Sequence, residues 1–429
     1  MNLEKPMAWM LGMAVAVAVF FQFHVTVSGT LINLNLADPF AILALIAVIF
    51  HLLLARQQPL WRVEKFSLAL GAISLLMVLA FMRGWLDIGI TKWALSARLV
   101  GWFVLLGYLS AGYLIAANFG AHGLRRFSET LAATAAVIVL LQVTLRVLDG
   151  LDMIQDVSLT PNFEGYSGNR NAFAFQLLTA VSLLLCLSPV YTKYGNKLRQ
   201  PWQPWVFAFL LGVLLAGLVW TGSRAGILVG VIVLLAARYA QLVDRRMLGL
   251  GLLFAALLWD GVWLLGSGLL GSGLGFSIQS SLSEDASNHE RWATMILALE
   301  LWRESPIVGI GLGVFMAKSP ALMGHPQVIH STPLWILTEF GLVGAAVFAW
   351  VFFMLARYAI KFGKILPARG TLLLLLIAFA IFGLVHEIFY QRIFWLVLGI
   401  LLARPFAFRV LDSSAATRAA KSLPSQSLV

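Results

Sequence analysis

Runs of about 20 apolar residues recur along almost the whole chain, and they decide what it can fold into. A helix needs about 20 predominantly apolar residues to cross the hydrocarbon core of a bilayer. The sequence therefore predicts an all-α membrane protein with about 12 transmembrane helices. The predicted segments are 8–28, 38–55, 66–83, 95–118, 128–148, 171–191, 204–222, 225–243, 247–267, 333–356, 371–389 and 392–408.

Composition excludes a water-soluble enzyme. Hydrophobic residues make up 60% of the 429 positions and charged residues only 11%, whereas an ordinary soluble domain carries about 25% charged residues. A single cysteine excludes a disulfide scaffold. The first apolar segment follows Lys5 and has no convincing small-residue cleavage site, so we expect a retained span and not a signal peptide.

The net charge of +11 could indicate nucleic-acid binding, but sorting the charges by membrane side gives a different explanation. Cytoplasmic loops of membrane proteins carry an excess of Lys and Arg. With both termini in the cytoplasm, 20 of the 30 basic residues fall inside and 10 outside. The charges therefore predict a multi-pass protein with both termini cytoplasmic.

This topology divides the chain into four parts. Residues 1–267 hold the first nine transmembrane helices, 268–332 form a long periplasmic loop, 333–408 hold the last three helices, and 409–429 form a cytoplasmic tail. Within the loop we expect an amphipathic helix at the membrane interface. Its apolar stripe is Trp292, Met295, Ile296, Leu299 and Trp302.

Arginines on the outer side oppose the positive-inside bias and are functional candidates. Arg224 lies in a hairpin between two spans, Arg291 opens the amphipathic helix, and Arg170 ends the other long outer loop. A guanidinium binds phosphate oxygens in a bidentate manner and stays charged. Interfacial anchoring, surface pairing or, for the neighbouring Asn169, helix capping would explain the same residues. Arg98 lies beside a short outer loop and is either another candidate phosphate ligand or an interfacial anchor.

His330 is the candidate general base, because it lies where the long outer loop enters a span. An imidazole at a water–lipid boundary can take a proton near neutral pH; an interfacial or capping histidine is the alternative. His325 is a weaker candidate of the same kind. The spacing of His325, His330 and Glu387 gives no support for a metal site, and we expect none. Glycines 309, 311 and 313 predict a tight turn or a close backbone approach.

Four passages resemble the O-antigen ligase and O-antigen polymerase superfamily of bacterial membrane glycosyltransferases. They are Gly168–Asn171, Gly222–Gly226, Arg291-Trp292 followed by Pro306–Phe315, and His330–Gly344. Their order around one long outer loop also matches the family. The family commonly has asparagine after the histidine, where this chain has Ser331.

The resemblance implies transfer of a glycan from undecaprenyl diphosphate to a lipid A–core sugar hydroxyl, at the periplasmic face of the bacterial inner membrane. No cofactor or metal ion is implied. By matching motifs, His330 would be the general base, and Arg224 and Arg291 would stabilise the departing diphosphate. The reaction would invert the anomeric centre. The substrate-binding candidates are Arg170, Asn169, Arg98, Ser331 and His325.

Two other functions stay open. An O-antigen or exopolysaccharide polymerase would use the same chemistry on a lipid-linked repeat unit. A transporter or flippase is a more distant alternative, since transporters gather polar groups near the bilayer midplane, often in paired halves. Here the charged groups gather at the outer face and no paired halves are recognisable.

Overall fold

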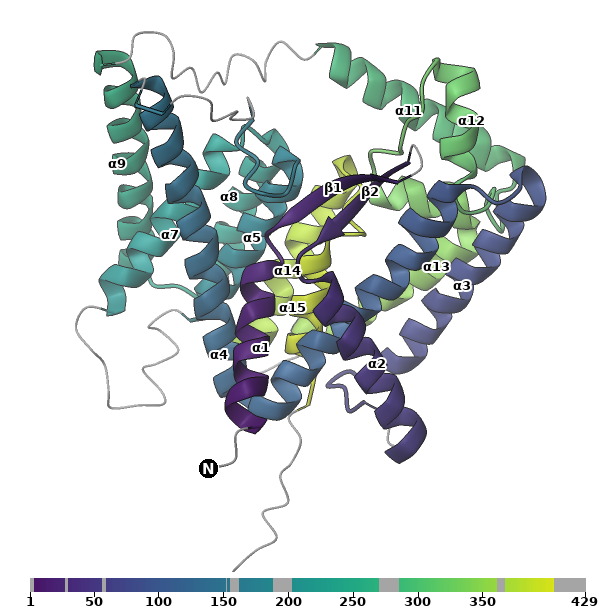
Figure 1. Cartoon of the computed structure of the whole chain (residues 1–429), viewed down its shortest axis with the longest axis horizontal. Coiled ribbons are helices and arrows are strands. Elements are labelled where there is room, and N and C mark those ends of the chain that lie inside the picture. Colours follow the sequence, from purple (N-terminus) through teal and green to yellow (C-terminus); the bar gives the residue numbers. More distant parts are fainter. Residues whose placement is uncertain are drawn as a thin grey trace, which may run out of the picture.

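Helices dominate the computed structural model, which describes residues 4–27, 30–55, 59–151, 153–154, 162–187, 203–269, 285–360 and 367–404 (Figure 1). The helices are α1 (Glu4–Ala18), α2 (Asp38–Ala55), α3 (Phe66–Ile88), η1 (Trp93–Val100), α4 (Gly101–Gly150), α5 (Arg170–Cys186), α7 (Gln203–Trp220), α8 (Arg224–Tyr239), α9 (Arg245–Leu269), α11 (Asp285–Glu304), α12 (Val314–Met323), α13 (Thr332–Ile360), α14 (Pro367–Val385) and α15 (Arg392–Leu402). A mostly helical membrane protein is confirmed.

Five apolar segments among the described residues are long enough to cross a bilayer. Two of them, Trp93–Gly120 and His122–Asp149, come from η1 and α4, because α4 breaks at Gly120, whose φ is 56°. Every predicted span corresponds at least in part to a helix, but several of these helices are short. The count of twelve therefore stays a prediction. The predicted tail and residues 270–284 of the long loop lie outside the described residues.

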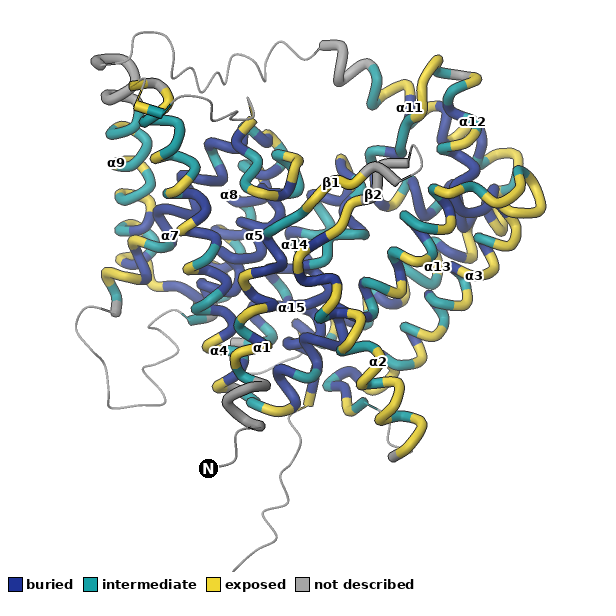
Figure 2. Tube along the Cα trace, in the orientation of Figure 1, coloured by how far each residue is buried: buried dark blue, intermediate teal, exposed yellow. Residues whose placement is uncertain are grey.

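Two helices form the centre of the bundle. Residues 393–402 of α15 are all buried, as is nearly all of α5, and Figure 2 shows this dark central zone. α15 packs closely on α4, because a Cβ on Gly112 or Gly399 would overlap the facing backbone of Leu396 or Leu109. Small residues allow such close approach in membrane bundles. The outer helices instead expose large apolar side chains such as Leu54 and Leu68, as expected for a surface in contact with lipid.

A two-stranded hairpin follows α1 and corrects the first predicted span. The segment 8–28 was expected to be one helix, but helix α1 ends at Ala18, and β1 (Gln22–Val27) pairs antiparallel with β2 (Thr30–Asn35). The residues Gln22 to Val27 alternate polar and apolar side chains, which is the period of a strand. The hairpin lies across the ends of α14 and α15 (Figure 1).

The segment predicted to be the long outer loop contains two helices, α11 and α12, of which only α11 was predicted. The face of α11 that is buried against α13 consists of Thr294, Leu297, Ala298 and Leu301. The predicted apolar stripe lies on the other face, where Trp292 is 65% exposed. Both faces of α11 are thus apolar, one toward the protein and one outward, which suits a helix at a membrane interface.

The glycine-rich loop after α11 forms backbone hydrogen bonds with α13 at a break in that helix. At Gly341, whose φ is 66°, the helix is interrupted. The carbonyls of Thr338 and Glu339 then accept the N–H groups of Ile310 (3.0 Å) and Gly311 (3.2 Å). In turn, the N–H groups of residues 342 and 343 donate to the carbonyls of Pro306 (2.9 Å) and Ile307 (3.0 Å). Four backbone groups of α13 at the break are thus paired, as a membrane environment favours. The close approach predicted for these glycines is confirmed.

We predict that Gly341→Ala destabilises the protein strongly. A Cβ there would overlap the backbone of Ile307 and Gly309, and its φ and ψ of 66° and −164° are essentially restricted to glycine, at a cost of about 1–3 kcal/mol. The melting temperature of the detergent-solubilised protein should fall by several degrees. Gly249→Ala is the matched control, because nothing lies near its Cβ in α9 and alanine favours a helix. Equal melting temperatures for the two variants would contradict the role of the kink.

Candidate functional site

A cavity of about 680 Å³ opens below the hairpin, between α5, η1, the α14–α15 loop and the start of α11. The ends of four helices that the charge pattern places on the outer side meet here. Of the predicted site residues, four line the cavity: His330, Arg291, Arg98 and Asn169. The structure thus brings together groups that are up to 232 positions apart in the sequence, from Arg98 to His330.

The other predicted residues lie around this cavity and not on its wall. Arg170 is the first residue of α5, and its charge reaches His386 on the wall. Ser331 is buried, and its Oγ accepts from the N–H of Leu334 at the start of α13. His325 is exposed, and its Nε2 lies 2.6 Å from Glu290. Arg224 is exposed at the start of α8.

His330 is positioned to act as a base. It lies just before α13 and lines the cavity. Burial lowers the pKa of its imidazole below 6.5, and the nearby charge of Arg291 lowers the pKa further, although Glu290 and Glu387 oppose this. A lowered pKa keeps the ring neutral at pH 7, so it can accept a proton.

Three cationic or proton-binding groups lie close to His386. Burial, together with the charges of Arg291, His330 and Arg170, lowers the pKa of its imidazole to about 3. His386 lines the cavity at the end of α14, and its carbonyl accepts a hydrogen bond from Thr332 Oγ1 (3.0 Å). The convergence makes this end of the cavity electropositive, which favours an anionic ligand.

Arg291 has no carboxylate partner among the described residues. The adjacent Glu290 is occupied elsewhere, because its Oε1 accepts from Gln327 Nε2 and lies against His325. These two contacts lower the pKa of Glu290. Arg291 therefore lines the cavity without an ion pair to any described carboxylate, which leaves its guanidinium able to bind an anion such as phosphate.

Asn169 caps α5 and connects the cavity to α8. Its Oδ1 accepts the N–H groups of Asn171 (2.8 Å) and Ala172 (3.2 Å), so the capping role considered for it is observed. The Oγ of Ser223, which caps α8, donates to the Asn171 side chain (2.8 Å). This bond holds the start of α8, and with it Arg224, beside the cavity wall.

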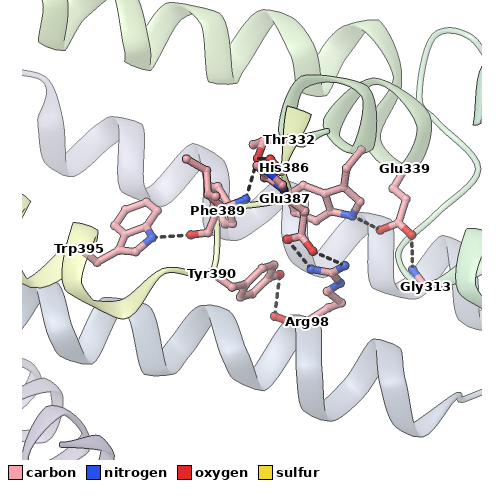
Figure 3. A network of polar contacts seen from close by, with 11 residues as sticks. Arg98, Gly313, Thr332, Glu339, His386, Glu387, Phe389, Tyr390 and Trp395 are labelled. Carbon is pink, nitrogen blue, oxygen red and sulfur yellow. Dashed lines mark hydrogen bonds and ion pairs between the residues drawn. The ribbon is translucent and has the colours of Figure 1, made fainter. Parts of the chain in front are cut away.

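Arg98 and Glu387 form a bidentate ion pair, with Nη–Oε distances of 2.7 and 2.9 Å (Figure 3). The guanidinium also lies over the rings of Trp93, Trp335 and Tyr390, about 5 Å from each centroid. The Tyr390 hydroxyl donates to the Arg98 carbonyl (3.0 Å), and burial raises the pKa of that hydroxyl. Most of the binding capacity of Arg98 is thus used to hold the α14–α15 loop.

A second ion pair attaches the hairpin to the bundle. Arg392, at the start of α15, donates to both carboxylate oxygens of Asp38 (2.8 and 3.1 Å) and to the carbonyl of Asn33 (2.7 Å). The Tyr108 hydroxyl and the N–H of Asn35 also donate to Asp38, each at 2.8 Å. These bonds fix β2 over the cavity.

Several cavity residues were missed by the sequence analysis. His24 was set aside as patternless, yet its ring lies directly against Gly168, where a Cβ would overlap it. Gln176 was overlooked although a polar residue inside a predicted span is a functional candidate. Asp38 and Arg392 were separated by most of the chain. No group of three or more potential metal-ligating side chains occurs in the described part of the chain.

We predict that Glu387→Gln costs about 3–5 kcal/mol of folding free energy, because it leaves a buried guanidinium without its counterion. Chemical or thermal unfolding of the purified protein measures the loss. The double variant Arg98→Met with Glu387→Leu removes both charges and should be the more stable of the two. A double variant that is less stable than Glu387→Gln would show that the ion pair is not what the loop depends on.

Comparison with known proteins bears directly on this site. No curated protein matches the chain. Residues 207–349 match the family described as O-antigen ligase, a segment that runs from α7 into α13 and includes Arg224, Arg291 and His330. The family's members are membrane glycosyltransferase-type enzymes acting on lipid-linked glycans. The resemblance found in the sequence is therefore confirmed, because this segment of the chain matches the O-antigen ligase family.

Proposed function

We propose that this protein is an O-antigen ligase-type glycosyltransferase of the bacterial inner membrane. In this proposal it moves a glycan from undecaprenyl diphosphate to a lipid A–core sugar hydroxyl at the periplasmic face. The observation that carries the proposal is one cavity lined by a neutral histidine, His330, and an arginine without a carboxylate partner among the described residues, Arg291. Both lie within the segment that matches the family.

The chemistry needs a base and a site for a leaving anion. His330 takes the proton from the acceptor hydroxyl as its oxygen attacks the anomeric carbon of the donor sugar. The bond from that carbon to the diphosphate breaks, and the electron pair leaves with undecaprenyl diphosphate. Attack from the opposite face inverts the anomeric centre. Because sugar diphosphates already carry a good leaving group, no nucleophilic side chain is required.

Arginines would stabilise the charge that grows on the diphosphate. Arg291 lines the cavity, and Arg170 acts on His386 at the same end. Arg224, held nearby through Ser223 and Asn171, would approach from the side of α8. Fixed cationic groups at a developing negative charge can supply the stabilisation that a divalent metal ion supplies in other transferases. We therefore propose a metal-independent reaction, which should persist in excess chelator.

An O-antigen or exopolysaccharide polymerase remains the second candidate, because the same base and arginines would serve a lipid-linked acceptor. The glycan profile of a strain lacking the gene separates the two. Loss of a ligase leaves long lipid-linked polymer that is not attached to core, whereas loss of a polymerase leaves single repeat units.

We expect His330→Ala to reduce glycan transfer by about 10²–10⁴-fold, the usual contribution of general base catalysis. Membrane insertion and donor binding should be retained. Transfer is measured with purified protein in proteoliposomes supplied with lipid-linked glycan and acceptor. The matched control is His122→Ala, a histidine on α4 that stacks on Trp9 outside the cavity. Transfer at the wild-type rate by His330→Ala would remove the proposed base.

Arg291→Lys should lower kcat about tenfold or more, because a lysine keeps the charge but cannot bind phosphate oxygens with two parallel bonds. Single-turnover transfer in the same proteoliposomes measures it. Arg303→Lys on the same helix, exposed and away from the cavity wall, is the control. An unchanged kcat in Arg291→Lys would argue against diphosphate binding at this position.

The pH profile should report the lowered pKa of His330. The unprotonated ring is the active form, so activity is lost as pH falls through the pKa of the folded protein. Because burial and Arg291 place that pKa below 6.5, kcat/KM should be level above pH 6.5 and decline only below it. An acidic limb with its midpoint above pH 6.5 would be incompatible with this base.

A further inference from the structure

Two buried polar atoms on the cavity wall have no hydrogen-bond partner in the described part of the chain. They are Oε1 of Gln176 and Nε of Arg98. Gln176 is 5% exposed, and its side chain makes no hydrogen bond to another described residue. A buried polar atom left without a partner costs about 1–3 kcal/mol, so such an atom on a cavity wall points to a ligand that completes it.

Gln176 lines the cavity from within α5. It follows Arg170, the first residue of α5, by six positions, which is about 9 Å along a helix. The cavity lining also includes apolar side chains, among them Val19, Val104, Leu105 and Ile393. The cavity therefore combines His330 and Arg291 with apolar side chains and with one buried hydrogen-bond acceptor that has no partner among the described residues.

The hairpin supplies a polar surface to the same cavity. In its register Gln22 pairs with Asn35 and His24 pairs with Asn33, so these four side chains share one face. All four line the cavity. Asn35 is used within the fold, where its Oδ1 accepts from the N–H of Ala37. The side chains of Gln22, His24 and Asn33 make no hydrogen bond to other described residues, so they are available to a ligand.

We propose that Gln176 and the polar face of the hairpin form a subsite for a sugar ring of the transferred glycan or of its acceptor. This inference rests on the proposed function. A pyranose carries hydroxyl groups that donate and accept hydrogen bonds around an apolar ring. Gln176 Oε1 accepts from one hydroxyl or N-acetyl N–H, while the amide and imidazole groups of Gln22, His24 and Asn33 bind the others. No bond is made or broken by these residues; they position the ring between the arginines and His330.

The test compares Gln176→Met, which keeps the size of the side chain and removes the acceptor, with wild type. Two probes are used separately: core oligosaccharide released from lipopolysaccharide by mild acid, and undecaprenyl-diphosphate-linked glycan. Binding is measured by ligand-induced change in melting temperature, and KM by transfer in proteoliposomes. Gln176→Met should weaken the binding of one of the two probes about tenfold, and kcat should change less than threefold. Weaker binding of core oligosaccharide assigns the subsite to the acceptor, and weaker binding of lipid-linked glycan assigns it to the donor.

A second readout separates this role from a purely structural one. If Gln176 Oε1 is paired only by a bound ligand, the unliganded Gln176→Met protein should melt at the same temperature as wild type or higher. The substitution removes the unpaired atom. Asn33→Ala on the hairpin should weaken the binding of the same probe. Thr179→Val, which removes a buried hydroxyl of α5 that bonds within the helix, is the control and should leave both probes unaffected.

Probe affinities within twofold of wild type in Gln176→Met overturn the subsite, whether or not transfer occurs. An equal loss of affinity for both probes, together with a lower melting temperature, also overturns the subsite, because that result indicates damage to the fold. A wild-type protein that binds a probe through Gln176 but transfers no glycan would instead remove the proposed function and keep the subsite.

Discussion

The ion pair between Arg98 and Glu387 holds the region on which the cavity depends. It joins η1 to the α14–α15 loop, and three aromatic rings surround the guanidinium and exclude water. A charge in such surroundings is tolerated only when it is paired and well packed. Thr332 bonds to both sides of the same loop, so the start of α13, and therefore His330, is tied to it. The position of the candidate base thus follows from a pair of charges that the proposed reaction does not use.

The glycine-rich loop places a second requirement on α13. Glu339 accepts from Trp335 Nε1 (2.7 Å) and from the N–H of Gly313 (3.0 Å), and together with the exchanged backbone bonds it locks the loop into the broken helix. This explains the glycines at positions 309 and 341, where a Cβ would overlap the backbone of the facing segment. The loop that follows α11 is thereby anchored, which holds the C-terminal end of α11 over the bundle.

Much of the helical arrangement could be predicted from apolar runs, because a lipid environment leaves helices as the simplest way to pair every backbone group. The candidate diphosphate ligands were predicted from charges placed against the positive-inside bias, and the candidate base from its place where a long loop enters a span; these roles stay predictions. Asp38 and Arg392 were not, since no local pattern joins residues at opposite ends of the chain. The hairpin was missed because Val, Phe and Ile are apolar in strands and helices alike, and the alternation in residues 22–27 was not weighed. Gln176 carried a usable signal, a lone amide in an apolar segment.

The hairpin has two chemically opposite surfaces. Gln22, His24, Asn33 and Asn35 line the cavity, while Phe23, Val25 and Leu34 are exposed on the other face. Since side chains alternate strictly along a strand, a shift of one residue exchanges the two faces completely. Insertions or deletions within a strand therefore keep the polar side chains toward the cavity only when they come in steps of two residues. The short ribbon between the first two helices is thus a constraint on insertions and deletions, quite apart from the identity of its residues.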